Sequence, residues 1–370
     1  MKKLIILEHE PLTIRLKKIW NIDSFKQKNV DVEYWDFSML IYPNISIPNR
    51  IEDKCVKVIG SLSSFEYLLS QLDARRTVFI VELFPTWNNR KIYFLINKYN
   101  IFHVKIDLYA NTSLPIPLRD KIISLIKNFP FIPILRRICW SIYKKCYSIT
   151  IYNQIYSSSK LVAPDVRINH PDFEAFTDTS DVKLCAEPYI LFIDTYYPLH
   201  PDLKFYLKYD DIDIYKKDYR DTMRAFFDYL ENKYHKTVII AAHPKSDYAG
   251  NEFGNRRIIK GETCNLIKNA DMIVTHESNS LSFIALANKP FIIVYPDSYN
   301  KYYHLLGYIT RLAKYCGKQA YNLNKDNWDN ICFSPLENHF RETYIYTFLT
   351  SAETQHKRNV DIWIDNLLKE

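Results

Sequence analysis

The sequence predicts an α/β protein built from two doubly wound domains that face a cleft. Apolar strand-like segments alternate with helical segments along most of the 370 residues, as in parallel sheets covered on both faces. The length suits two domains of roughly 100 to 200 residues each. Gly occurs only 6 times, and neither G-x-G-x-x-G nor G-x-x-x-x-G-K-[ST] is present. The sequence therefore argues against a dinucleotide fingerprint and a P-loop.

The first half of the chain supplies the elements of one domain. Strands are predicted where apolar residues run without interruption, and helices where they recur every three to four residues. We assign strands to 3–10, 31–37, 77–84 and 101–111, helices to 61–74 and 87–100, and the last strand of the domain to 147–165.

The second half repeats this alternation and predicts a second α/β domain. Residues 169–188 are polar and lack clear periodicity, so we interpret them as the linker. We assign strands to 189–195, 237–244, 271–278 and 290–297, and helices to 219–235, 262–270 and 279–289. The predicted domains are therefore 1–168 and 186–350, followed by a C-terminal helix in 351–370 that can pack back on the first domain.

Polar side chains follow successive strands of the second domain. In doubly wound sheets, ligands bind at the carboxyl ends of the strands. His243 and Lys245 can donate charge-assisted hydrogen bonds to an anion, and hydroxyls at a helix start add further donors. This pattern predicts a phosphate site, more specifically for the phosphate of a nucleotide. The candidate residues are Asp194, His243, Pro244, Lys245, Thr275, His276, Glu277, Ser278, Asn279 and Ser280.

Some of these residues also have a purely structural interpretation. Ser278 or Asn279 could be a helix N-cap, and His243, which precedes a proline, could be a turn residue. Their joint occurrence at successive strand ends favours the ligand site.

Carboxylates follow the strands of the first domain. Glu8, His9 and Glu10 lie after the first strand, Glu82 after another, and Asp107 at the end of a third. A carboxylate across a cleft from a phosphate site is well placed to deprotonate a hydroxyl nucleophile. The structural alternative is that these acids cap helices or pair with Lys or Arg.

The "HP" at 243–244 and the Ser/Thr-rich turn at 275–282 resemble motifs of bacterial GT-B glycosyltransferases. These are the sialyltransferase-like and Kdo-transferase-like enzymes of capsule and lipopolysaccharide synthesis. The stretches "YILFIDTYYPLHPDLK" and "IIAAHPKSDY" also look like proteins encoded in polysaccharide gene clusters. The resemblance covers mainly residues 186–297. It implies the GT-B fold of two Rossmann-like domains and a transfer that needs no metal.

The resemblance also implies individual roles. His243 would contact the nucleotide phosphate and support the leaving group, and Ser278 and Ser280 would hold that phosphate. In the sialyltransferase-like enzymes, an acidic D/E-D/E-G motif upstream of HP supplies the base. Asp107 lies at a comparable distance, although "KIDLYAN" has neither the paired acid nor the glycine. Asp107 is the first candidate for the base and Glu10 the second.

These observations predict an inverting glycosyltransferase of bacterial surface polysaccharide synthesis. Its substrates would be a nucleotide sugar, with a CMP-activated acidic sugar as the first hypothesis, and an oligosaccharide or lipid-linked saccharide. The alternatives are a polysaccharide pyruvyltransferase and a non-catalytic nucleotide- or sugar-binding assembly protein. The resemblance implies that no metal is needed, and no cofactor is expected besides the nucleotide-sugar substrate. We interpret the D-x-D at 211–213 as a surface loop, because no apolar strand precedes it.

Charge and cysteine usage indicate the compartment. The net charge of +7 suits an anionic substrate or membrane surface and does not indicate a nucleic-acid partner. The 7 scattered cysteines favour reduced thiols. The initial apolar run and all later ones are too short for a signal peptide or a transmembrane helix. We therefore expect a cytoplasmic protein.

A basic and aromatic segment at 118–147 predicts peripheral contact with the inner face of an anionic membrane. Trp140 lies there among apolar side chains and bases such as Arg136 and Lys144, a combination typical of interfacial helices. The alternative is an ordinary helix covered on one side by the first domain.

Overall fold

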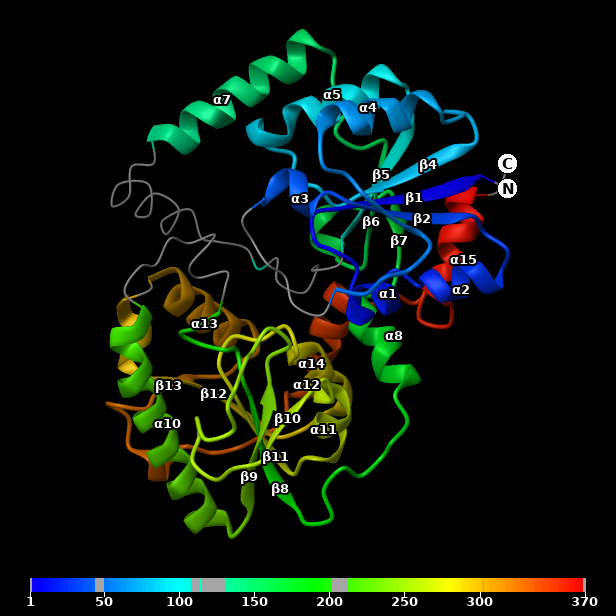
Figure 1. Cartoon of the computed structure of the whole chain (residues 1–370). Coiled ribbons are helices and arrows are strands. Elements are labelled where there is room, and N and C mark those ends of the chain that lie inside the picture. Colours follow the sequence, from blue (N-terminus) through cyan, green and yellow to red (C-terminus); the bar gives the residue numbers. More distant parts are fainter. Residues whose placement is uncertain are drawn as a thin grey trace. The chain divides into compact units, whose positions relative to one another are not determined.

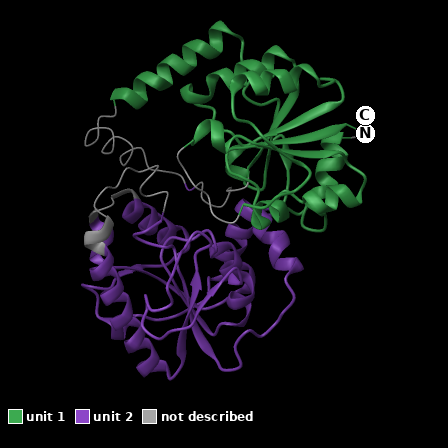
Figure 2. Cartoon of the chain, viewed as in Figure 1, with its two compact units in different colours: residues 1–110, 115–169, 351–370 green, residues 111–114, 170–350 purple. Residues whose placement is uncertain are grey.

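The computed structural model describes residues 2–43, 50–107, 114, 131–200, 212–301 and 303–368 (Figure 1). These residues form two compact units (Figure 2). Unit 1 comprises the described residues of 1–110, 115–169 and 351–370, and unit 2 those of 111–114 and 170–350.

Unit 1 is built on a sheet of seven parallel strands in the order β3-β2-β1-β4-β5-β6-β7. Its strands are β1 (Lys3–Glu8), β2 (Val32–Asp36), β3 (Val56–Val58), β4 (Thr77–Val81), β5 (Phe102–Asp107), β6 (Gln154–Ser157) and β7 (Val166–Arg167). Its helices are α1 (Ile14–Ile19), α2 (Ile22–Gln27), α3 (Ser38–Ile41), α4 (Leu62–Ser70), α5 (Arg90–Lys98), α7 (Phe131–Cys146) and α15 (Asn359–Trp363), which continues as a π-helical turn at Ile364–Leu368.

Both faces of this sheet are buried, because strand β1 alternates between two apolar clusters. Leu4 and Ile6 pack on one side with α1, α2 and α15, whereas Ile5 and Leu7 pack on the other with α4 and α5. The rings of Trp363 and Phe25 stack at 5.9 Å, which fixes the C-terminal helix on unit 1.

Unit 2 has six parallel strands in the order β10-β9-β8-β11-β12-β13. Its strands are β8 (Tyr189–Ile193), β9 (Thr237–Ala242), β10 (Ile258–Lys260), β11 (Met272–Thr275), β12 (Phe291–Tyr295) and β13 (Ala320–Asn322). Its helices are α8 (Pro171–Asp178), α10 (Ile212–Tyr234), α11 (Thr263–Asn269), α12 (Leu281–Ala287), α13 (Tyr303–Tyr315) and α14 (Asn338–Tyr344), which continues as a π-helical turn at Ile345–Leu349.

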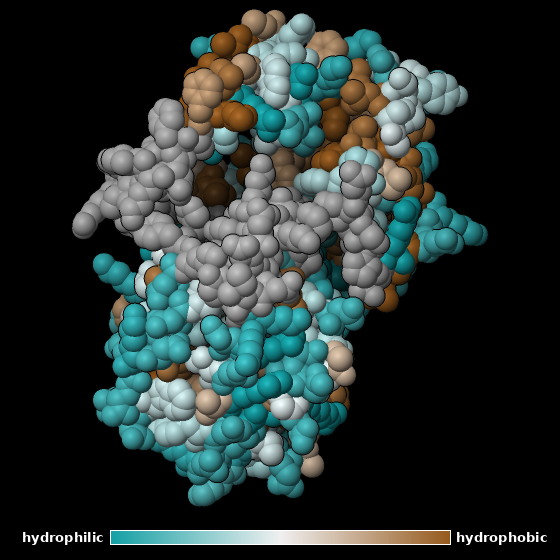
Figure 3. All heavy atoms as spheres, turned by 60° about the vertical axis from the view of Figure 1, so that its left-hand side comes forward, coloured by the Kyte–Doolittle hydropathy of each residue, from teal (hydrophilic) through white to brown (hydrophobic). Residues whose placement is uncertain are grey.

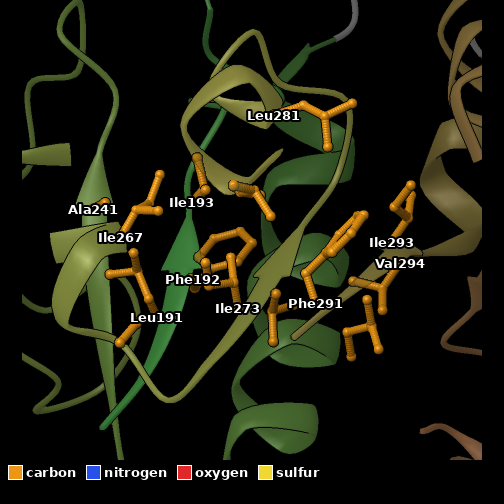
Figure 4. Close-up of a cluster of buried hydrophobic side chains, with 14 of the residues drawn as sticks. Leu191, Phe192, Ile193, Ala241, Ile267, Ile273, Leu281, Phe291, Ile293 and Val294 are labelled. Atoms are coloured by element: carbon orange, nitrogen blue, oxygen red, sulfur yellow. The ribbon is translucent and has the colours of Figure 1, made fainter. Parts of the chain in front are cut away.

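The core of unit 2 follows from its uninterrupted apolar strands. Side chains of β8, β11 and β12, such as Phe192, Ile273 and Phe291, are completely buried together (Figure 4). Burying each such side chain contributes about 1.5 to 3 kcal/mol. The predicted class of two Rossmann-like, doubly wound domains, as GT-B proteins contain, is therefore confirmed within each unit.

Two sequence-based assignments are wrong in detail. Residues 171–178 of the expected linker form helix α8, in which His170 accepts from the backbone N–H of Asp172 and caps the helix. Asp172 in turn accepts a hydrogen bond from Ser282 of α12, so α8 belongs to unit 2. The single strand expected in 147–165 is instead the short β6, and β7 follows it as the last strand of the sheet.

Candidate functional site

The carboxyl ends of the central strands of unit 2 bring together most of the predicted phosphate-site residues. Strands β9, β8, β11 and β12 are parallel neighbours. The residues that follow them therefore emerge at one edge of the sheet, where doubly wound domains bind ligands. Asp194 follows β8, His243 follows β9, and the run from His276 to Ser280 follows β11.

Asp194 links the loops at this edge through hydrogen bonds. Its carboxylate accepts hydrogen bonds from the backbone N–H of Tyr196 at 2.9 Å, the backbone N–H of His243 at 3.2 Å and the hydroxyl of Tyr248 at 2.9 Å. Burial raises the pKa of Asp194 to about 6 in spite of these donors. Asp194 therefore positions the loop after β9, because it ties His243 and Tyr248 to the end of β8.

The hydrogen bonds of His243 define its tautomer. The backbone N–H of Lys245 donates to Nδ1 of His243 at 3.1 Å, so Nδ1 carries no proton. In the neutral ring the proton is then on Nε2, which is a hydrogen-bond donor. The backbone carbonyl of His243 accepts from the hydroxyl of Ser246 at 2.7 Å, which closes the turn. The turn interpretation of His243 and its suitability as an anion ligand are thus compatible.

Arg220 is a cation near this edge that the sequence reasoning missed. It lies on α10, is half-buried, and its positive charge acts on Asp194 and Glu252. Strand-end reasoning could not find it, because it comes from the middle of a helix. A guanidinium is well suited to binding phosphate.

Thr275 and His276 belong to the core. Thr275 is the last residue of β11 and is buried. His276 is completely buried: its Nδ1 lies 2.6 Å from the carbonyl of Val294, and its Nε2 lies 3.0 Å from the hydroxyl of Tyr219. Burial lowers the pKa of His276 to about 4. The expectation that His276 contacts a nucleotide is therefore wrong, because a neutral ring inside the aromatic core has a structural role.

Glu277 is an unusual carboxyl group beside the phosphate-site candidates. The residue is half-buried, its Oε2 is buried without a hydrogen-bond partner, and its side chain bonds to Tyr299. Burial raises the pKa of Glu277 to about 8. Glu277 is therefore mostly uncharged at neutral pH and adds little repulsion toward an anion at this edge.

The Ser/Asn turn leads directly into α12. The backbone N–H of Ser280 donates to Oγ of Ser278 at 3.2 Å, and the N–H of Leu281 donates to the carbonyl of Ser278 at 3.1 Å. Ser280 occupies the N-cap position, but its side chain makes no capping hydrogen bond. The structural alternative, in which Ser278 or Asn279 is the N-cap, is therefore not seen, since Ser280 holds that position and Ser278 forms a local turn. Asn279 and Pro244 are exposed.

The carboxyl edge of unit 1 is lined with acids. Asp36, Glu8, Glu82 and Asp107 come from the neighbouring strands β2, β1, β4 and β5. Burial raises the pKa of Glu82 well above its usual value, and the charge of Glu8 adds to this effect. The sequence reasoning missed Asp36, which lies inside the predicted strand 31–37 rather than after it.

His9 is the best-positioned base at this edge. Its Nδ1 lies 2.7 Å from Oε1 of Glu8 and 3.0 Å from the carbonyl of Glu82. Both neighbours are acceptors, so Nδ1 carries the proton and Nε2 holds the lone pair of the neutral ring. The ring also packs against Phe84, with the centroids 4.9 Å apart. The sequence reasoning placed His9 in this loop but did not choose it as the base.

Burial alone would lower the pKa of His9. The hydrogen bond and charge of Glu8, together with the charge of Glu10, outweigh this effect and raise the pKa above its usual value. A raised pKa makes the neutral ring of His9 a stronger proton acceptor, as a general base requires.

The two carboxylates chosen from the sequence are differently placed. Asp107 is buried, and its Oδ2 accepts from the hydroxyl of Ser157 at 3.0 Å. Glu10 is half-buried, and its Oε2 lies 3.9 Å from Nη2 of Arg15. Both groups lie at the predicted edge, but His9 presents a proton-accepting atom that a buried carboxyl partner orients.

The remaining predictions concern metal and membrane. Among the described residues, no group of His, Cys, Asp and Glu could hold a metal ion. Of the D-x-D at 211–213, Asp211 lies outside the described residues and Asp213 lies in α10. Residues 118–130 of the predicted membrane segment lie outside the described residues. No helix within the described ranges has the length and apolar character needed to cross a bilayer.

Trp140 does not belong to a lipid-facing surface. It is buried in unit 1, where its ring lies 6.0 Å from that of Tyr93. The prediction that Trp140 contacts membrane is therefore wrong, because the helix uses this side chain to pack on its own domain.

Comparison with known proteins shows similarity only to solved structures. No family model and no curated protein matches the chain. Spinosyn forosaminyltransferase SpnP is 10% identical, with a TM-score of 0.47 and 100% of each chain covered. MurG of Acinetobacter baumannii is 9% identical, with a TM-score of 0.45 and 99% of each chain covered. UDP-GlcNAc 2-epimerase from Methanocaldococcus jannaschii is 15% identical, with a TM-score of 0.43, 79% of this chain and 83% of that chain covered.

Proposed function

We propose that the protein is a glycosyltransferase that moves a sugar from a nucleotide donor to a hydroxyl group of a saccharide. The observation that carries this proposal is His9, whose Nδ1 lies 2.7 Å from the carboxylate of Glu8. A buried carboxylate that orients a histidine in this way leaves Nε2 to accept the proton of a hydroxyl nucleophile.

The edge of unit 2 supports a donor phosphate. His243 offers Nε2–H as a donor, and Lys245 and Arg220 add positive charge. Charge-assisted donors of this kind stabilise the negative charge that develops on a departing phosphate. Of the acids at this edge, Glu277 opposes binding only weakly, because burial raises its pKa to about 8 and leaves it mostly uncharged at neutral pH. The carboxylate of Asp194 already accepts hydrogen bonds from the backbone N–H groups of Tyr196 and His243 and from the hydroxyl of Tyr248.

The reaction is a direct, inverting displacement without a covalent intermediate. Nε2 of His9 takes the proton of the acceptor hydroxyl as its oxygen attacks the anomeric carbon. The bond between that carbon and the phosphate oxygen breaks, and the nucleotide leaves with the electron pair. His243, Lys245 and Arg220 supply the positive charge that a metal ion would otherwise provide.

The resemblance of "HP" at 243–244 and the turn at 275–282 supports a finer assignment. The donor is a CMP-activated acidic sugar, and the acceptor is an oligosaccharide or lipid-linked saccharide of a bacterial surface polysaccharide. The net charge of +7 is compatible with such anionic substrates.

A thermal-shift series tests the donor assignment. The full chain is melted with CMP, UDP, GDP, TDP or phosphoenolpyruvate at equal concentrations. A nucleotide at 100 times its Kd stabilises the folded state by about 2.7 kcal/mol, so the preferred base gives the largest rise in Tm. We expect CMP to give that rise.

The other outcomes of the series are equally informative. A rise with UDP, GDP or TDP keeps the transferase and replaces the sugar. Stabilisation by phosphoenolpyruvate alone would support a pyruvyltransferase instead. No response to any nucleotide contradicts the proposal. If the protein binds a nucleotide but shows no turnover, and His9→Gln leaves that binding unchanged, the protein is a binding protein and not a transferase.

A further inference from the structure

Helix α7 exposes a continuous apolar face. Phe131, Leu135, Ile138 and Ile142 recur every three to four residues, so they lie on one side of the helix. Each remains 47 to 63% exposed. In the view of Figure 3, hydrophobic side chains gather on unit 1, whereas the visible face of unit 2 is mostly hydrophilic.

The opposite side of α7 attaches the helix to its domain. Trp140 is buried and packs against Tyr93, and Tyr143 lies 5.9 Å from the ring of Trp87. The outer apolar face is therefore not needed to hold α7 in place. Four large apolar side chains in a row on a firmly attached helix indicate an interaction surface.

The charge of α7 selects the kind of partner. Arg136, Arg137, Lys144 and Lys145 all lie on this helix, and no Asp or Glu occurs between 131 and 147. A second copy of the chain would bring an equally basic helix to the interface, which disfavours self-association. An anionic surface with an apolar interior satisfies both the bases and the exposed apolar face.

We propose that the outer face of α7 docks unit 1 onto an anionic phospholipid surface. Phe131, Leu135, Ile138 and Ile142 enter the acyl boundary, while the exposed bases Arg136, Arg137 and Lys145 reach the headgroups. Lys144 stays with the domain, because its Nζ lies 5.5 Å from the ring of Trp140. Trp140 remains in the domain. This inference does not depend on the proposed transfer reaction, since no residue of α7 belongs to the candidate site.

Vesicle co-sedimentation of the full chain tests the proposal. The probes are vesicles of phosphatidylcholine alone and of phosphatidylcholine with phosphatidylserine. We expect binding to the anionic vesicles, weakening as salt is raised, and a loss of affinity of at least about tenfold in the Ile138→Ser/Ile142→Ser double variant. Ile14→Ser is the matched control, because Ile14 is 64% exposed on α1 of the same unit; it should bind as the wild type does.

Three results would overturn the proposal. They are equal binding to neutral vesicles, unchanged binding of the double variant, and a wild-type dimer that the double variant converts to a monomer. The Arg136→Gln/Lys145→Gln variant leaves the apolar face intact and should lose binding to anionic vesicles. All of these α7 variants should keep the nucleotide-induced rise in Tm. Loss of vesicle binding can then be told apart from loss of the proposed transferase function.

Discussion

The carboxyl edges of the two sheets share one architecture but differ in chemistry, and two histidines show how. His9 follows β1 of unit 1, and His243 follows β9 of unit 2. Nδ1 of His9 lies against the carboxylate of Glu8, whereas Nδ1 of His243 accepts from the backbone N–H of Lys245. The first histidine therefore offers a lone pair on Nε2 and the second offers a proton.

This contrast shows that a strand-end position alone does not define a role. The group on Nδ1 decides whether the outer nitrogen accepts or donates a proton. Unit 1 surrounds its histidine with acids, which favour proton uptake. Unit 2 places Lys245, Arg220 and the mostly uncharged Glu277 near the edge where its histidine lies, which favours an anion.

The largest effect is expected for His9→Gln, which tests the base in unit 1. Gln keeps a side chain of similar size but cannot take up a proton. We expect kcat to fall by about 10³-fold, within the range for loss of a general base, while nucleotide affinity measured by calorimetry stays unchanged. A kcat within a factor of two of wild type would return the role to Asp107 or Glu10, and Asp107→Asn and Glu10→Gln would then be the next variants.

The next effect concerns stability and tests the uncharged acid of unit 2. The folded-state pKa of Glu277 is about 8, above the usual 4.5. Protonated Glu277 therefore stabilises the folded state fully below pH 4.5, and this contribution to the free energy of unfolding is lost as the pH rises toward 8. Glu277→Gln should match wild type near pH 4 and be more stable near pH 8.5, by on the order of 3 kcal/mol.

Denaturant unfolding at the two pH values measures this difference. Glu342→Gln is the matched control, because Glu342 is an exposed carboxylate of the same unit; its stability relative to wild type should not change with pH. A Glu277→Gln variant that is less stable than wild type at pH 8.5 would show that the carboxylate is charged in the folded protein.

A smaller effect separates the two roles of His243. In His243→Asn, Oδ1 can still accept the backbone N–H of Lys245, as in an Asx turn, but the outer donor is lost. In His243→Ala both are lost. We expect His243→Asn to weaken nucleotide binding about tenfold, or about 1.4 kcal/mol, with an unchanged Tm, and His243→Ala to lower the Tm as well. Wild-type affinity in His243→Asn would limit this residue to a turn role.

The sequence allowed prediction of the central strands and of the edge where the site lies. Uninterrupted apolar runs such as that of β8 can be recognised in a single sequence. Because the strands are parallel, their carboxyl ends lie at the same edge of the sheet. The edge strands β3, β7, β10 and β13 escaped prediction, because they are only two or three residues long and most of their residues are not fully buried.

The partners of the site residues could not be predicted, because they come from distant parts of the chain. His276 follows an apolar strand just as His243 does, yet it is buried by Tyr219, 57 residues away in sequence. The positive charge of Arg220, which lies on helix α10, interacts with Asp194 at the end of β8. The choice of His9 over Asp107 required the distance from His9 to Glu8, which no local pattern contains.

The smallest expected effect is a shift of the pH profile in Glu8→Gln, and it tests whether the carboxylate tunes His9. The hydrogen bond and charge of Glu8 raise the pKa of His9, and activity requires the unprotonated ring. Wild-type kcat/KM should therefore fall as the pH drops through this raised pKa. In Glu8→Gln the charge is gone, so the acid limb should move to lower pH, while the nucleotide-induced rise in Tm, which reports on unit 2, stays the same. An acid limb that stays in place would mean that His9 is not the titrating base.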